Sequence, residues 1–107
     1  MGEVTAYLGL GSNIGDRDLN LSKTMNLLTR SPEVTLERSS SIYQTEPWGL
    51  IGQPKFLNSV IEIKTSLDPI NLLAHTQTIE EGLGRRVGLR FGPRLIDIDL
   101  LLYGDQS

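Results

Sequence analysis

The order of strand-like and helix-like segments is the strongest constraint on the fold of this chain. Apolar residues alternate with polar or small ones in four segments, which we predict to be strands: about 5–12, 34–43, 57–65 and 95–103. Two segments with helical spacing follow the capping residues Asp16 and Asp68, the first ending before the sequence SPE and the second near Glu81. The resulting β-α-β-β-α-β order predicts an α+β, ferredoxin-like fold with one antiparallel sheet and both helices on one face.

The last predicted strand carries two aspartates, Asp97 and Asp99, inside the apolar run LIDIDLLLY. Because strand side chains alternate, both carboxylates point to one face, about 6.5 Å apart along the chain. We expect Ile98, Leu100 and Leu102 to fill the opposite, core-facing side. The alternative is an edge strand with a solvated acidic face, which the apolar neighbours disfavour. The pair is therefore interpreted as a cation site, since Mg²⁺ is typically held by one or two carboxylates plus substrate phosphates.

A glycine-rich segment directly before this strand contains four arginines: Arg85, Arg86, Arg90 and Arg94. Planar guanidinium groups suit phosphate oxygens. Taken alone, such a segment is equally consistent with a solvated charged turn. Its position beside the two aspartates favours a polyphosphate site, in which cations offset the carboxylates and arginines meet the phosphates.

Other polar and aromatic residues are less specific. Gln77 and Glu80 lie three apart and so face one side of the second helix, a pattern that by itself is typical of helix surface. His75 is the only histidine, and we expect it to be structural. The stretch GLGSNIGD is weak evidence for a phosphate loop, because it lacks the Lys-Ser/Thr ending and the dinucleotide spacing.

Trp48 and Phe56 flank a loop rich in proline and glycine. Exposed aromatic rings held in this way suit stacking on a flat heterocycle. The side-chain amide of Asn58 has both a donor and an acceptor for the edge of such a ring. The alternative is that the loop folds back and buries both rings in the core.

Length, charge and composition exclude several classes of protein. The 107 residues suffice for a single domain over 1–107. A net charge of −3 argues against a nucleic-acid partner, including an RNA-binding module of the same topology, which needs exposed aromatics and a basic surface. No apolar run could span a bilayer, no leader is recognisable, and the lack of cysteine fits a reducing compartment. We therefore expect a cytoplasmic monomer with no membrane partner.

Four stretches together resemble one enzyme family, the 6-hydroxymethyl-7,8-dihydropterin pyrophosphokinases of folate biosynthesis: YLGLGSNIGD, SIYQTEPWG, QPKFLNSV and FGPRLIDIDLLLYG. They follow the family's order over nearly the whole chain. The resemblance implies an ATP-dependent diphosphotransferase that moves the β,γ-pyrophosphoryl group of ATP to the pterin hydroxymethyl group and releases AMP. Such a transfer needs charge neutralisation and in-line positioning more than a covalent nucleophile.

The resemblance also implies roles for individual residues. Asp97 and Asp99 would bind two Mg²⁺ ions and, with Arg85 and Arg94, form the catalytic group, in which Arg85 stabilises the transition state. The pterin would stack on Phe56, and its edge would meet the Asn58 side chain and the backbone at Thr45 and Trp48. ATP would contact the following residues: Gln77, Glu80, Arg85, Arg94 and Leu100.

The same resemblance implies that family members continue well beyond the position of Gly104. That continuation carries a second aromatic over the pterin, and a histidine and an arginine on the ATP side. A fragment of such an enzyme and a naturally shortened form are both consistent with this sequence, and in either case we expect a folded core with slow turnover. The alternative function is a truncated or non-catalytic form that binds pterin or nucleotide, and AMP formation separates the two.

Overall fold

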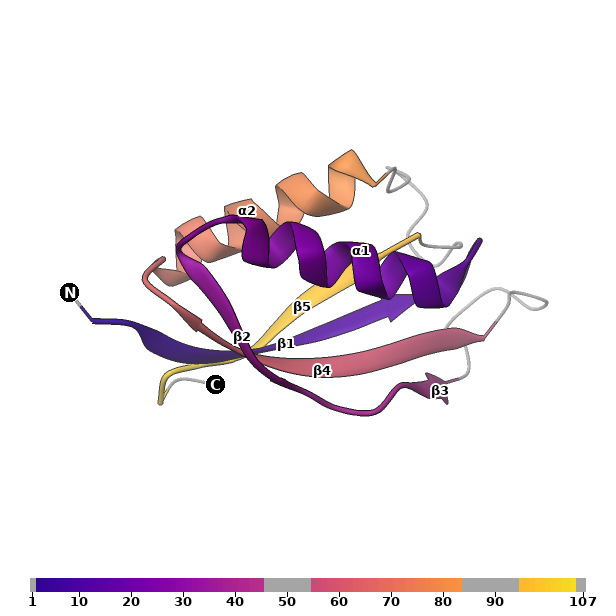
Figure 1. Cartoon of the computed structure of the whole chain (residues 1–107), viewed down its shortest axis with the longest axis horizontal. Helices are drawn as coiled ribbons and strands as arrows, with labels where there is room; N and C mark the ends of the chain where they lie inside the picture. The colour runs from indigo at the N-terminus through magenta and orange to yellow at the C-terminus, as the bar shows by residue number, and fades with distance from the viewer. Residues whose placement is uncertain (1, 46–54, 84–94, 106–107) are drawn as a thin grey trace.

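The computed structural model describes residues 2–45, 55–83 and 95–105. Within them, five strands and two helices follow one another in an α+β order (Figure 1). Their bounds are β1 (Val4–Ser12), α1 (Arg17–Arg30), β2 (Val34–Ser39), β3 (Tyr43–Thr45), β4 (Phe56–Thr65), α2 (Pro69–Gly82) and β5 (Asp97–Tyr103).

The strands form one antiparallel sheet in the order β2-β4-β1-β5, and β3 also pairs with β4. Both helices cover the same face of this sheet, which confirms the ferredoxin-like arrangement expected from the sequence (Figure 1). Strands β1 and β4 are central, and β5 lies at one edge within the described part of the chain. Neither helix covers the opposite face of the sheet (Figure 1), and Asn58, Asp97 and Asp99 line a pocket there.

The hydrophobic core lies between the sheet and the two helices. Most of its fully buried members alternate along the strands or recur at helical spacing, as the sequence predicts: Ala6, Leu8, Leu10, Leu21, Leu28, Ile61, Ile63 and Leu72. Met25 of the predicted α1 stripe packs against this cluster from a half-buried position. Burial of each large aliphatic side chain contributes about 1.5–3 kcal/mol, so this layer is the main source of stability.

The prediction of one continuous strand over 34–43 is wrong, because the structure divides this segment into β2 and β3. Ser39 pairs with Ile61, and Tyr43 pairs with Asn58. Between these two pairs, the segment that joins β2 to β3 has one residue more than β4. Ser40 accounts for the break, since its hydroxyl accepts the backbone N–H of β4 residue 60 at 2.8 Å. A side-chain oxygen thus replaces a backbone carbonyl in the ladder, and the strand bulges.

The predicted inward face of β5 is confirmed for Ile98 and Leu100 and wrong for Leu102, which is 40% exposed. The register of β5 against β1 slips by one residue at Leu101. A one-residue slip exchanges the two faces of a strand, so Tyr103 turns inward after the bulge and Leu102 turns outward.

Both predicted helix caps are present. The Asp16 carboxylate accepts the Leu19 N–H at 3.1 Å, and the Asp68 carboxylate accepts the Asn71 N–H at 2.8 Å. Each bond satisfies one of the backbone donors that a helix N-terminus leaves open.

We expect Asp16→Ala to lower the free energy of unfolding by about 1 kcal/mol, because the cap acceptor at the start of α1 is lost. Asp16→Asn retains an acceptor and should stay close to wild type. Urea denaturation of the two variants measures the difference, and equal stabilities would contradict a role for this cap.

Candidate active site

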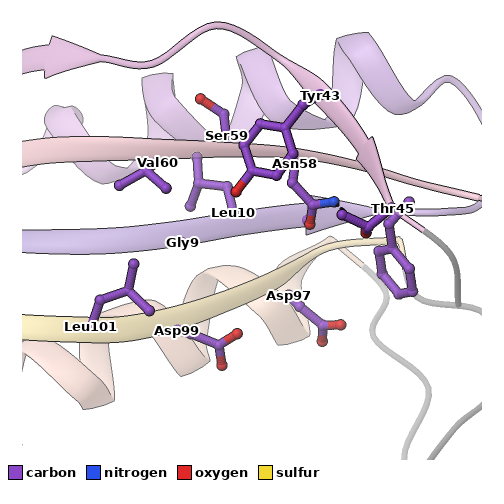
Figure 2. Close-up of a pocket in the computed structure, with 12 residues that line it drawn as sticks. Gly9, Leu10, Tyr43, Thr45, Asn58, Ser59, Val60, Asp97, Asp99 and Leu101 are labelled. Carbon is purple, nitrogen blue, oxygen red and sulfur yellow. Dashed lines mark hydrogen bonds between the residues drawn. The ribbon is translucent and has the colours of Figure 1, made fainter. Parts of the chain in front are cut away.

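A pocket of about 400 Å³ opens on the face of the sheet that the helices leave uncovered. Residues from β1, β3, β4 and β5 line it, so strands distant in sequence meet there (Figure 2). The pocket has an acidic wall on β5, a polar and aromatic wall on β3 and β4, and a floor on β1.

The floor consists of Gly9 and Gly11 of the central strand β1, both of which line the pocket. Gly9 pairs with Asp99 on β5, and Gly11 pairs with Asp97 on β5 and with Asn58 on β4. Because glycine has no side chain, the two walls remain separated by open space. The pocket therefore depends on the alternating glycines of β1.

A larger residue at Gly11 would displace neighbouring side chains of the pocket. A Cβ built at this position would lie 2.9 Å from Asn58 Oδ1 and 3.3 Å from a ring carbon of Phe56. Sequence reasoning treated GLGSNIGD only as a weak phosphate-loop signal and missed the role of its glycines. The available signal was their spacing of two within a strand, which puts both on one face.

The acidic wall confirms that the two aspartates of the last strand share one face. The apolar neighbours had disfavoured an edge strand, and this expectation is wrong, because β5 lies at the edge of the sheet in the described part of the chain. Asp97 and Asp99 point the same way, toward the open face and away from the helices (Figure 2). Asp97 is half-buried and Asp99 is exposed. Among residues 2–45, 55–83 and 95–105, no group of three or more His, Cys, Asp or Glu could enclose a metal. Two carboxylates facing open space still fit Mg²⁺, which keeps several waters and takes phosphate oxygens as ligands.

The second wall brings together Thr45, Phe56 and Asn58. Asn58 Nδ2 donates a hydrogen bond to Thr45 Oγ1 at 2.6 Å, which holds the amide against β3. Phe56 is half-buried at the pocket, so the alternative of a ring in the core is wrong for this residue. Tyr43 also lines the pocket and is 46% exposed; sequence reasoning missed it, although it lies two residues from Thr45 on the same strand.

The spacing of Gln77 and Glu80 alone had suggested that both lie on the helix surface, but Glu80 does not. It is 3% exposed, and its Oε2 accepts the backbone N–H of Ile98 at 2.8 Å, whereas Gln77 on the same helix is exposed. Leu100 packs against the core cluster. Gln77, Glu80 and Leu100 therefore lie on the helix side of β5, and the structure does not bring them into the pocket.

Several predicted site residues lie outside the described parts of the chain. They are Trp48, Arg85, Arg86, Arg90 and Arg94. His75 is described, and its Nε2 lies 3.2 Å from the backbone oxygen of Leu28, so it links α2 to α1 as a structural histidine.

Buried polar residues hold the turn that follows the pocket floor. Asn20 Nδ2 donates to Ser12 Oγ at 3.0 Å and to the Ile14 carbonyl at 2.9 Å. Gly15 allows this turn, because its φ of 71° is strained for other residues. These contacts indicate that the SNIG part of the glycine-rich stretch shapes the connection between β1 and α1.

Across the described residues, none of the helices is both long and apolar enough to cross a membrane.

Comparison with known proteins adds independent evidence on the family. The family model described as 7,8-dihydro-6-hydroxymethylpterin-pyrophosphokinase (HPPK) matches residues 7–106. A 2-amino-4-hydroxy-6-hydroxymethyldihydropteridine pyrophosphokinase from Bacillus subtilis (strain 168) is 49% identical over 102 residues, covering 95% of this chain and 61% of the relative. A protein of the same name from Aquifex aeolicus (strain VF5) is 44% identical and is covered over 62% of its length.

A two-function relative matches as well. The bifunctional protein FolKE of Lactococcus lactis subsp. cremoris is 39% identical over 103 residues, which cover 96% of this chain and 30% of that protein. The chain spans about three fifths of the length of the two pyrophosphokinases that it matches.

Proposed function

Because the chain belongs to the 7,8-dihydro-6-hydroxymethylpterin-pyrophosphokinase family, we propose that it binds ATP and 6-hydroxymethyl-7,8-dihydropterin and transfers pyrophosphate between them with Mg²⁺. The products are AMP and the pterin diphosphate. One observation carries the proposal: a single pocket holds two carboxylates opposite an aromatic ring and an amide suited to a flat heterocycle.

The pterin occupies the wall formed by β3 and β4. Phe56 stacks on one face of the ring, and Asn58 meets the donor and acceptor groups of its edge. The hydrogen bond to Thr45 supports this role, because it holds the Asn58 amide in one orientation before the ligand arrives. Backbone groups at Thr45 and Trp48 add further edge contacts.

The phosphates occupy the side of the pocket next to β5. Asp97 and Asp99 would hold two Mg²⁺ ions, which supply charge neutralisation for the transferred group when bound. Arg85 and Arg94 contact the phosphate oxygens, and Arg85 stabilises the charge that develops during transfer. Gln77 and Leu100 contact the rest of the nucleotide beyond the edge of β5.

Positioning is the main chemical contribution of the described residues. The walls stand on opposite sides of the glycine floor. A pterin on β4 that turns its hydroxymethyl group toward β5 would bring this group to the acidic wall. Holding two reactants in line converts a bimolecular step into an effectively unimolecular one.

The decisive experiment measures AMP and pterin diphosphate formed from ATP and 6-hydroxymethyl-7,8-dihydropterin with and without Mg²⁺. We expect equal amounts of both products, only with Mg²⁺, and the Bacillus subtilis relative serves as the positive control. Binding of both ligands without AMP would favour the non-catalytic alternative. Absence of binding to either ligand would contradict the proposal.

We expect Phe56→Leu to weaken pterin binding about five- to tenfold, because the loss of a stacking ring removes about 1 kcal/mol or slightly more. Leucine keeps an apolar side chain, so the free energy of unfolding should change little. Fluorescence titration with the pterin measures the change, and Phe56→Tyr, which keeps a ring, is the control. Equal affinities for the Leu and Tyr variants would argue against stacking at this position.

A further inference from the structure

A buried carboxylate on α2 contacts the backbone of β5 midway between the two aspartates. Glu80 is 3% exposed, and its Oε2 accepts the N–H of Ile98 at 2.8 Å. Ile98 separates Asp97 from Asp99 in sequence. The contact therefore restrains the residue that lies between the two pocket carboxylates.

The hydrogen bond occupies a backbone donor that the sheet does not use. In an antiparallel pair, successive residues direct their backbone groups alternately toward the partner strand and away from it. The Ile98 N–H bonds to α2, so the backbone groups of Asp97 and Asp99 face β1, where these residues pair with Gly11 and Gly9. Outward N–H groups on an edge strand need another acceptor, and a carboxylate is a strong one.

Strand β5 has a specific need for such a restraint. Its register against β1 already slips by one residue at Leu101, only two residues beyond Asp99. A further one-residue slip would turn both carboxylates toward the core and their apolar neighbours toward the pocket. A fixed contact upstream of the bulge disfavours that slip.

We infer that Glu80 is a positioning residue, whose hydrogen bond to the Ile98 backbone holds Asp97 and Asp99 in the orientation that cation binding requires. The inference rests on the magnesium role under the proposed function. It assigns Glu80 to the support of β5 and not to direct contact with the nucleotide, in keeping with its burial. The hydrogen bond to Ile98 needs an acceptor oxygen at position 80, which glutamine also supplies.

The test compares Glu80→Gln, which keeps an acceptor oxygen, with Glu80→Leu, which removes it at similar size. Glu81→Gln and Glu81→Leu are matched controls, because Glu81 is the next residue and is exposed. Two quantities are measured in each variant of the full chain: hydrogen exchange of the Ile98 amide, and Mg²⁺ affinity in the presence of a non-hydrolysable ATP analogue.

We expect Glu80→Leu to accelerate exchange at Ile98 and to weaken Mg²⁺ binding about tenfold or more, as for other supports of metal ligands. Glu80→Gln and both Glu81 variants should remain close to wild type in both measurements. Rescue by glutamine separates this role from a general loss of stability.

Two results would overturn the inference about Glu80 and leave the proposed magnesium role untouched. One is faster exchange at Ile98 in Glu80→Leu with unchanged Mg²⁺ affinity. The other is a Glu80→Gln variant that loses Mg²⁺ affinity, and this result decides the matter even if Glu80→Leu does not fold. A wild-type chain without Mg²⁺-dependent nucleotide binding would instead overturn the proposed magnesium role, and the inference with it.

Discussion

Replacement of Asp97 and Asp99 together by asparagine is expected to abolish the Mg²⁺ dependence of nucleotide binding and to leave the fold intact. Asparagine keeps the side-chain volume but removes the charge that a hard cation requires. Loss of both ligands should cost about 3 kcal/mol or more of Mg²⁺-nucleotide affinity, which is roughly a hundredfold or more. Calorimetric titration of the ATP analogue with and without Mg²⁺ measures this change.

The control for this double variant is Asp105→Asn, the same chemical change at an exposed turn residue just after β5. It should leave Mg²⁺-dependent binding unchanged. In metal-free buffer the double variant should unfold at the same or a higher urea concentration than wild type, since two neighbouring like charges are removed. A large loss of stability combined with intact Mg²⁺-dependent binding would show that the aspartates are structural.

Substitution of Gly11 by alanine should weaken pterin binding about tenfold to a hundredfold. The added Cβ would lie 2.9 Å from Asn58 Oδ1 and 3.3 Å from a Phe56 ring carbon, so at least one of these side chains must move. Forcing side chains out of their preferred positions in this way typically costs about 1–3 kcal/mol. Because the displaced groups are those proposed to read and stack on the pterin, the effect should appear in pterin affinity more than in ATP affinity.

Gly9→Ala provides a matched comparison on the same strand and face. Its Cβ would lie 3.5 Å from the nearest atom of Leu101, which is ordinary van der Waals contact. We expect this variant to fold like wild type and to lose clearly less pterin affinity than Gly11→Ala. Equal losses for the two variants would contradict the proposal that a Cβ at Gly11 displaces Asn58 or Phe56.

Much of the fold could be predicted because its signals are local. The caps at Asp16 and Asp68 depend on backbone groups three residues away, and alternation along a strand follows from backbone geometry alone. The same local rule placed Asp97 and Asp99 on one face of β5, which the structure confirms.

Local rules failed where a distant segment decides the outcome. Alternation predicted an inward Leu102, but pairing with β1 introduces a bulge that reverses the face. Likewise, the break at Ser40 depends on a hydrogen bond to β4, twenty residues further along the chain. Neither irregularity has a signal in the apolar pattern of its own strand, because it belongs to the pairing between strands.

For the candidate site, the sequence by itself determined which chemical groups are available: paired carboxylates, an aromatic ring, an amide and the glycines of β1. Only the tertiary structure decided that Gly11 lies between Asp97 and Asn58, because sheet order places β1 between β5 and β4. It also decided that Glu80 is buried against β5, since helical periodicity defines the faces of α2 but not which strand edge each face meets. Which strand α2 packs against depends on contacts between residues distant in sequence, because these contacts determine the free energy of packing the helices on the sheet.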